Sequence, residues 1–352
     1  MKGSVKTVFP GNNSAEGFYS FYESGLSAMD HVYILKGGPG TGKSSFMRHL
    51  GEAFRDRGFD IELWQCSSDN DSLDGVLIPA YKTAVVDGTA PHTLDPVYPG
   101  AREEILNLGE FWKNNALRKE KDAIVSLTDR ISAAFDDAYK KLKTAGEWDD
   151  RLLSCRKTDA SQESGAESLV KELFGDETRS DRHLFAAAVT PDGMVDRTFE
   201  ICRDVKKRCF LQGKRGLGQQ SYLRTVMAAA QKRCISMDVY HGPIRPEEIV
   251  MVILPELDTV VAAAEVIPSS EMREGDRIIS FHGDKVSEEE KRAEKERNAA
   301  LDAASAQIMK AHKLHDELEA FYTAAMDFES INRLEKIIFQ KILKNIQNGK
   351  NL

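Results

Sequence analysis

The stretch His31–Ser45, HVYILKGGPGTGKSS, decides how the rest of the chain is interpreted. Its apolar run Val32–Leu35 is typical of a buried strand. A glycine-rich turn follows at once, and a helix is expected to open at Lys43. The turn fits the pattern G-x-x-x-x-G-K-[ST], with strand, loop and helix in the order that a phosphate-binding loop requires. The stretch therefore predicts a nucleotide site.

The residue types suit that chemistry. Glycines let the backbone N–H groups of the loop point inward at an anion, and the helix adds the positive end of its dipole. We expect Lys43 to reach the β- and γ-phosphates and the Ser44 hydroxyl to bind Mg²⁺. The chain lacks an N-K-x-D guanine motif, so ATP is the expected nucleotide. The predicted nucleotide-binding residues are Gly37, Gly38, Pro39, Gly40, Thr41, Gly42, Lys43, Ser44 and Ser45.

A second carboxylate is expected at Asp87, which ends the small apolar run Thr83–Val86. In this position it would hold Mg²⁺ directly or through water, and we predict a catalytic role for it together with Lys43. The alternative is an ordinary aspartate that caps the next turn. The following residue is Gly88 rather than a glutamate base. The choice of base therefore stays open among Asp69, Asp71, Asp74 and His92, with a self-capping acidic turn as the alternative for the first three.

Composition restricts the class of protein. The chain has 352 residues, a net charge of −8 and a sequence pI of about 5.6. Nucleic acid is not an expected partner, because it is bound through basic patches. The five cysteines show no C-x-x-C pair, which favours reduced thiols. No signal-peptide run opens the sequence, and its most apolar run, Ile249–Leu254, is too short to span a bilayer. We expect a cytoplasmic protein with no membrane partner.

Local patterns predict further elements in the first half. Lys6–Phe9 and Asp60–Cys66 are expected strands, and Glu104–Leu108 fits either a strand or a helix. Asn13 and Glu16 have capping-box spacing, which predicts a helix from about Ala15 to Gly25. Apolar residues at helical spacing from 124 to 145 predict a long amphipathic helix.

The sequence repeats itself at a shift of 176 residues. Phe9, Gly37 and Arg48 then fall on Phe185, Gly213 and Arg224 without a gap. In the second half, Thr190-Pro191 is expected to start the first helix, and a second long helix is expected around 301–322. We therefore predict an α/β fold of two tandem P-loop NTPase-like, three-layer α/β/α units, each with a long helical C-terminal extension. The predicted domains are residues 1–175 and 181–345, with 168–174 as a helix end.

The second half has lost the groups that would contact a nucleotide. Its loop, GKRGLGQQS, keeps three glycines but has Gln219 and Gln220 where the first loop has its Lys and Ser, and Ala263 falls opposite Asp87. We therefore expect this copy not to hydrolyse nucleotide, while weak binding or a regulatory role stays open. Lys214 and Arg215 are expected to be solvated, with a positive finger toward the first site as the alternative.

The segments KGGPGTGKSS (36–45), CSSDNDSLDG (66–75), IPAYKTAVVDGTAPH (78–92) and DPVYPGAREEILNLGEFW (95–112) carry a wider resemblance. With the repeated second half, the chain resembles a family of bacterial tandem P-loop ATPases. The resemblance covers nearly the whole chain and implies the same fold, but no substrate. In that family both loops are expected to be intact, and this sequence departs from the pattern at Gln219, Gln220 and Ala263.

Three functions follow as hypotheses. The first is a Mg²⁺-dependent ATPase or ATP-driven switch that uses the N-terminal site, with the long helices as the surface for a protein partner. The second is a small-molecule or nucleotide kinase, with the loop Thr89–Gly100 as a lid. The third is an ATP-binding scaffold without catalysis. A coiled-coil interaction arm is an alternative for the helices at 286–326, whose charge-rich start, SEEEKRAEKER, is expected to be a solvated helix face.

Overall fold

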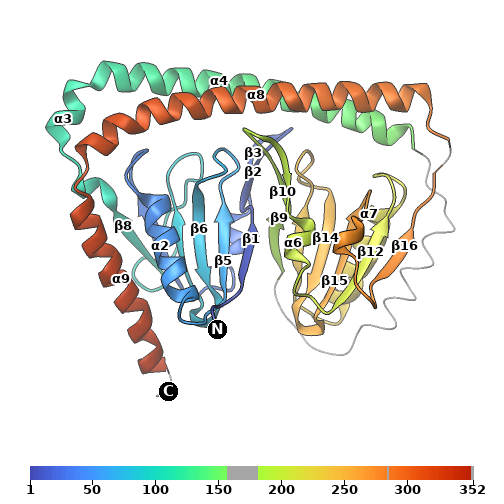
Figure 1. Cartoon of the computed structure of the whole chain (residues 1–352), viewed down its shortest axis with the longest axis horizontal. Coiled ribbons are helices and arrows are strands. Elements are labelled where there is room, and N and C mark those ends of the chain that lie inside the picture. The colour runs from blue at the N-terminus through green and yellow to red at the C-terminus, as the bar shows by residue number, and fades with distance from the viewer. Residues whose placement is uncertain (157–180, 284, 350–352) are drawn as a thin grey trace.

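The computed structural model describes residues 1–156, 181–283 and 285–349 of the chain. It is a mixed α/β structure with two six-stranded sheets (Figure 1). The predicted helix end at 168–174 lies outside the described residues. Within the described ranges, no helix is both long and apolar enough to cross a bilayer.

The first sheet has one antiparallel strand among otherwise parallel neighbours. In spatial order its strands are β1 (Val5–Val8), β5 (Ile61–Gln65), β6 (Leu73–Ile78), β7 (Thr83–Asp87), β4 (His31–Lys36) and β8 (Glu103–Asn107). The pairs β5·β6 and β6·β7 are antiparallel, and the others are parallel. The strands predicted before the glycine-rich turn and at Asp87 are thus correct, and the ambiguous segment at 104–108 lies mostly in a strand, β8.

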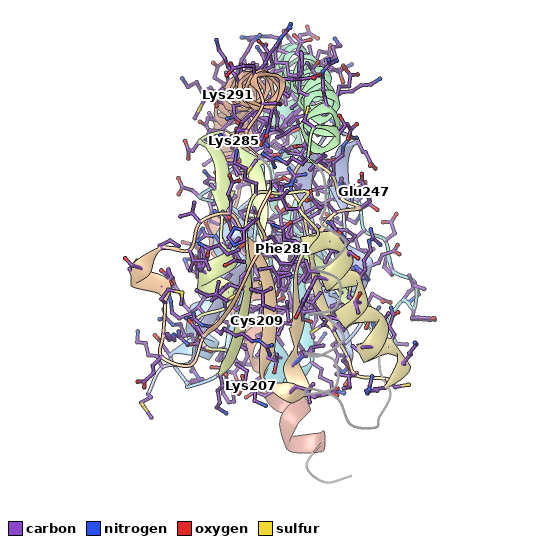
Figure 2. All side chains as sticks on the ribbon, turned by 90° about the vertical axis from the view of Figure 1, so that its right-hand side faces the viewer. Lys207, Cys209, Glu247, Phe281, Lys285 and Lys291 are labelled. Carbon is purple, nitrogen blue, oxygen red and sulfur yellow. The ribbon has the colours of Figure 1, made fainter. Side chains whose placement is uncertain are left out.

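The second sheet repeats this order and these directions. Its strands are β9 (Arg182–Phe185), β13 (Asp238–His241), β14 (Ile249–Leu254), β15 (Thr259–Ala264), β12 (Lys207–Gln212) and β16 (Arg277–Ser280). The antiparallel strand is β14, which starts 176 residues after β6. Figure 2 views this half end-on, with Lys207 and Cys209 of β12 far from the long helices and Lys291 on one of them.

Two hairpins replace the predicted first helices. The segment expected to be helical from Ala15 to Gly25 forms β2 (Gly11–Ser14) and β3 (Gly17–Ser20), and only α1 (Tyr22–Gly25) is helical. Asn13 does not cap a helix, because its buried amide donates to Ser67 and to the carbonyl of Val189 in the other half. Long-range hydrogen bonds therefore prevail over the local capping pattern.

The second half also has a hairpin where a helix was predicted. Thr190, predicted to start a helix, ends β10 (Ala187–Thr190), which pairs with β11 (Gly193–Asp196). Gly193 has a φ of +96°, a conformation that suits a tight hairpin turn and not a helix start. The short helix α6 (Thr198–Ile201) follows the hairpin.

Helices cover the outer face of each sheet. On the outer side of the first sheet lie α2 (Lys43–Arg55) and α9 (Phe328–Gly349), and on the outer side of the second lies α7 (Gln219–Lys232). The inner faces share one apolar core with α1 and α6, which includes the buried Trp64 and Tyr240. The other elements of the described residues are α3 (Asn114–Lys119) and the 3₁₀ turns η1 (Pro79–Tyr81), η2 (Leu108–Phe111), η4 (Pro255–Leu257) and η5 (Ser269–Glu271).

The two halves meet through reciprocal contacts. Phe9 and Phe185 exchange backbone hydrogen bonds of 3.2 and 2.9 Å. Beside them, four buried or half-buried charges cross the interface. Lys6 Nζ lies 3.1 Å from Asp238, and an Arg182 guanidinium nitrogen lies 2.6 Å from Glu62. Under the 176-residue shift Lys6 corresponds to Arg182, and Glu62 corresponds to Asp238. The two ion pairs are therefore equivalent.

Two long helices, α4 (Lys121–Ser154) and α8 (Glu288–Ala325), run side by side across both sheets (Figure 1). The prediction of two long helices was correct, but each one crosses to the opposite half. Near its end, α4 brings Leu153 against Gly216 of the second loop, while α8 brings Tyr322 against Gly38 of the first. After α8, α9 packs on the first sheet, with the Phe339 ring 5.0 Å from that of Phe54.

Candidate functional site

The strand, loop and helix that the sequence predicted are present around Lys43. Strand β4 ends at Lys36, and α2 begins at Lys43. Gly40 and Gly42 have φ values of +64° and +85°, which glycine adopts without strain. The buried Thr41 hydroxyl donates to the carbonyl of Gly38 at 2.8 Å and closes the turn.

Lys43 and Asp87 come together beside this loop. The Lys43 ammonium donates to the carbonyls of Gly37 and Gly38 at 3.1 and 2.8 Å, and it lies 3.6 Å from a carboxylate oxygen of Asp87. The other oxygen of Asp87 accepts a hydrogen bond from the backbone N–H of Thr89 at 2.8 Å. Both charged side chains are largely buried, at 11% and 14% exposure. A positive and a negative group thus face each other at a glycine-rich helix N-terminus.

The remaining predicted loop residues have different surroundings. Ser44, the predicted Mg²⁺ ligand, accepts a hydrogen bond at Oγ from the backbone N–H of Leu73 at 3.0 Å. Pro39 is partly exposed within the loop, and Ser45 faces solvent on the first turn of α2. The loop backbone, Lys43, Ser44 and Asp87 therefore form the candidate site, and Ser45 lies at its edge.

Helix α8 of the second half covers the loop. A Glu319 carboxylate oxygen accepts a hydrogen bond from the backbone N–H of Gly40 at 3.1 Å. A Cβ added at Gly38 would lie 2.7 Å from Tyr322, and one at Gly40 would lie 2.7 Å from Thr323. The helix can approach this closely because glycines stand at both positions. Sequence reasoning missed Glu319, because no local pattern links residues 279 positions apart.

A histidine accompanies Glu319 on the same face of α8. His315 Nδ1 lies 3.6 Å from Glu319 Oε1, at the spacing of one helical turn. Burial lowers the pKa of His315, and the positive charge of Lys43 lowers it further, although Glu319 opposes the shift. The cover over the loop thus presents a carboxylate and an imidazole that favours its neutral form.

The acidic turn does not place all of its carboxylates in the site. Asp69 Oδ1 accepts from the backbone N–H of Asp71 at 3.0 Å, and its other oxygen accepts from the Ser72 hydroxyl. This is the self-capping turn that was the alternative prediction for Asp69. The side chain of Asp71 is exposed, while its carbonyl accepts from Arg48 at 2.5 Å. The Asp69 carboxylate is thus engaged within its own turn, and the Asp71 carboxylate faces solvent.

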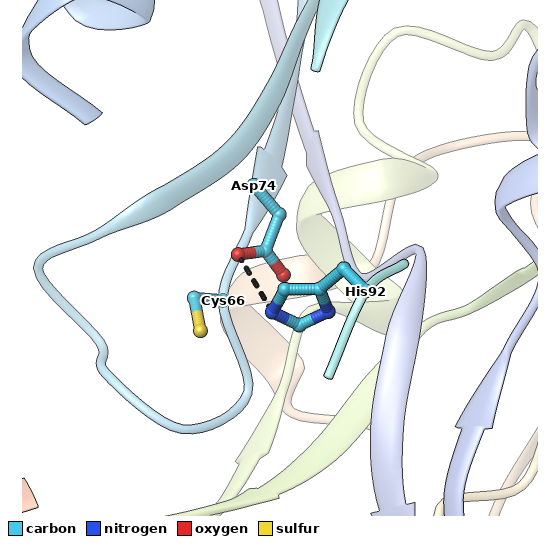
Figure 3. Close-up of side chains that lie close together, drawn as sticks. All are labelled: Cys66, Asp74 and His92. Atoms are coloured by element: carbon cyan, nitrogen blue, oxygen red, sulfur yellow. Dashed lines mark ion pairs between the residues drawn. The ribbon is translucent and has the colours of Figure 1, made fainter. Parts of the chain in front are cut away.

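The other two candidate bases form a buried group with Cys66 (Figure 3). His92 Nε2 lies 3.4 Å from Asp74 Oδ1. Burial raises the pKa of Asp74, although His92 acts in the opposite direction, and burial raises the pKa of the Cys66 thiol well above its usual range. Tyr22, whose ring stacks on that of His92 at 5.5 Å, also has a raised pKa because it is buried. The sequence indicated Asp74 and His92 separately but did not associate Cys66 with them.

The second loop has the same backbone plan with uncharged contacts. Gln219 Nε2 donates to the carbonyls of Gly213 and Lys214 at 3.0 and 2.9 Å, as Lys43 does in the first loop. Its amide oxygen accepts from the backbone N–H of Leu217. Gln220 Nε2 donates to the carbonyl of Ile249, the position that matches Leu73. Leu211 pairs with Ala263 in the register in which Leu35 pairs with Asp87.

The basic residues of this loop are engaged, which corrects the expectation that they are solvated. Arg215 makes a two-pronged contact with the buried carboxylate of Asp149 on α4, at 2.9 and 2.8 Å, and also pairs with Glu248. Lys214 Nζ lies 3.2 Å from Glu290 at the start of α8. These contacts attach the second loop to the two long helices, and they do not direct the charges at the first site.

In comparisons with protein-family models, curated proteins and solved structures, nothing matched this chain. The resemblance to tandem P-loop ATPases accordingly stays a prediction from the sequence motifs.

Proposed function

We propose that the protein binds ATP with Mg²⁺ at the loop Gly37–Ser45 and acts as an ATPase or ATP-driven switch through this site. The observation that carries the proposal is the meeting of Lys43 and Asp87 at 3.6 Å beside the loop. A triphosphate would draw the ammonium away from the carbonyls it now contacts. Asp87 would then share the metal with Ser44.

The second half supports this assignment by contrast. We infer that the halves arose by duplication, because their strand orders and directions agree and their equivalent charges cross the interface reciprocally. Gln219 fills the place of Lys43 and satisfies the same two carbonyls without a charge. A neutral amide offsets none of the charge on a triphosphate, so we assign nucleotide turnover to the first half.

The position of α8 favours a switch. Glu319 places a carboxylate on a loop N–H that would otherwise face a phosphate. Nucleotide binding would displace this carboxylate and move the end of α8. Because α8 packs along α4, which holds Arg215 of the second loop through Asp149, the displacement would reach the opposite half and any protein bound to the helices.

A kinase is the second candidate, and the surroundings of Gly88 favour it. A Cβ at this position would lie 2.4 Å from a methyl group of Ile34, so a glutamate base directly after Asp87 does not fit without a shift in the core. A phosphoryl acceptor that brings its own nucleophile would not need that base.

Turnover measurements separate these functions. Purified protein is given ATP with Mg²⁺, and released phosphate and ADP are followed with and without candidate acceptors. Phosphate release without an acceptor that disappears on removal of Mg²⁺ supports the ATPase, and ADP formation that requires an acceptor supports the kinase. Tight ATP binding without either product indicates a scaffold, and absence of binding refutes the proposal.

A further inference from the structure

We propose that Cys66, Asp74 and His92 form a binding site for one divalent cation of the zinc class. Each residue offers one donor atom, and the three atoms lie within 4.8 Å of one another (Figure 3). A thiolate, a carboxylate and an imidazole are the ligand types that Zn²⁺ takes in proteins. This inference rests on these three side chains and does not depend on the nucleotide proposal.

The chain holds the donors on three separate segments. Cys66 directly follows β5, Asp74 lies within β6, and His92 belongs to the loop after β7. All three are buried, at 7%, 3% and 7% exposure. The imidazole is fixed by aromatic rings, with Tyr22 stacked at 5.5 Å and Phe18 edge-on at 4.9 Å. A small contraction of these segments would bring the donors to the spacing of a tetrahedral site.

Two donor atoms of the group have no partner within the described chain. Asp74 Oδ2 and His92 Nδ1 are buried and make no hydrogen bond there, and the contact between Asp74 and His92 is long, at 3.4 Å. A buried polar atom without a partner costs about 1–3 kcal/mol, so such atoms need an explanation. A cation would neutralise the carboxylate. It would bind one of the unpartnered atoms directly, or a water bound to the metal would form a hydrogen bond with that atom.

The second half shows that the fold does not need these polar residues. Under the 176-residue shift Cys66 and Asp74 fall on Gly242 and Val250, directly after one strand and within another strand of a sheet with the same order and directions. The loop from 265 to 276, which follows β15 as the loop of His92 follows β7, contains no histidine. All three donors are thus absent together from a sheet that is otherwise built alike. A set of residues that is present or absent as a whole, and that packing does not require, points to a shared ligand.

The donor set also separates this site from the Mg²⁺ site proposed for the nucleotide. Magnesium takes oxygen ligands, whereas sulfur and nitrogen favour zinc and related metals. Three protein ligands leave the fourth position of a tetrahedron for water. His92 lies in the loop that starts directly after Asp87, so the metal would tie this loop to β5 and β6.

Metal titration tests the site without nucleotide. The full chain is stripped with EDTA, freed of chelator and titrated with Zn²⁺ against a chromophoric competitor, and Co²⁺ is added in parallel to read thiolate–cobalt absorption. We expect one Zn²⁺ per chain and a charge-transfer band with Co²⁺. Cys66→Ser should remove the band and weaken Zn²⁺ binding at least about tenfold, and His92→Gln should weaken binding similarly.

Two controls make the result decisive. Cys234→Ser removes a sulfur elsewhere and should leave the metal affinity unchanged, and Lys43→Ala should leave it unchanged as well. Circular dichroism of each stripped variant shows that it is folded. The inference is overturned if the folded wild type binds no Zn²⁺, or if Cys66→Ser and His92→Gln both bind it like the wild type.

Discussion

Glu319 Oε1 accepts a hydrogen bond from the backbone N–H of Gly40 at 3.1 Å, although the two residues belong to opposite halves of the chain. The contact sets a negative side chain on the loop that we propose binds a triphosphate. The carboxylate and a phosphate would compete for the same donor. Under this proposal, occupancy of the loop would be linked to the position of α8.

Removal of the Glu319 charge should tighten ATP binding. Glu319→Gln keeps the side-chain shape but no longer repels the nucleotide, a change worth about 1 kcal/mol and thus about fivefold in Kd. Equilibrium titration with ATP and Mg²⁺ measures the change. Glu317→Gln, on the exposed face of the same helix, should leave the Kd as it is. Unchanged or weaker binding by Glu319→Gln would exclude the competition.

Asp87→Asn should impair the use of Mg²⁺ more than the binding of ATP. The substitution keeps the acceptor for Thr89 but removes the charge opposite Lys43, so turnover should fall roughly 10–100-fold and require more Mg²⁺. Phosphate release at a series of Mg²⁺ concentrations gives both the turnover and the Mg²⁺ concentration that it requires. The control is Asp95→Asn, which removes an exposed carboxylate from the following loop. Equal effects of the two substitutions would argue against a metal role for Asp87.

The attachment of the second loop to α4 should contribute to stability. Asp149→Asn weakens the two-pronged contact with Arg215 and leaves the half-buried guanidinium with Glu248 as its remaining charge partner among the contacts described above. We expect a loss of about 2 kcal/mol in the free energy of unfolding, less than for a fully buried pair because Arg215 keeps some exposure. Denaturant unfolding measures it. The neighbouring Asp150→Asn removes an exposed carboxylate that pairs with Arg245 and should cost less than about 1 kcal/mol. If Asp149→Asn lowers the free energy of unfolding no more than Asp150→Asn does, the contact between Asp149 and Arg215 does not stabilise the fold.

Stability should fall below pH 6.5 because of a histidine at the interface of the halves. His241 donates from Nδ1 to the carbonyl of Pro246 and accepts at Nε2 from His183, and burial lowers its pKa from 6.5 to about 4. The unfolded chain therefore binds the proton more readily. This contribution is complete above pH 6.5 and is lost as the pH falls toward 4, by about 2 kcal/mol at pH 5.

The measurement is denaturant unfolding at pH 7 and pH 5. The wild type should lose about 2 kcal/mol more than His241→Gln between these values. His31→Gln, at an exposed position, should behave like the wild type. If the stability of His241→Gln depends on pH as that of the wild type does, another group causes the loss of stability at low pH.

The sequence predicted those parts of the fold that depend on local pattern. The apolar run before Gly37 and the helical periodicity after Lys43 correctly gave β4 and α2, and the 176-residue shift anticipated matching strands in both halves. The capping pattern at Asn13 failed, because that side chain is used in contacts with Ser67 and Val189. Such contacts have no local signal, since they exist only once the halves have packed.

The candidate site likewise contains residues that the sequence could predict and residues that it could not. Lys43, Ser44 and Asp87 could be predicted, because each is tied to the end of a strand or the start of a helix. Glu319 could not be predicted, because α8 crosses to the opposite half and its periodicity does not show which surface it will cover. Cys66 was likewise missed, since its neighbours in space come from two other segments.

The most direct test of the central claim is a calorimetric titration of ATP with Mg²⁺ into the wild type, Lys43→Ala and Gln219→Ala. The account predicts one site per chain, an affinity reduced on the order of 10–100-fold in Lys43→Ala, and no change in Gln219→Ala. Unchanged affinity in Lys43→Ala, or a loss in Gln219→Ala of the same size, would contradict a single nucleotide site at the first loop.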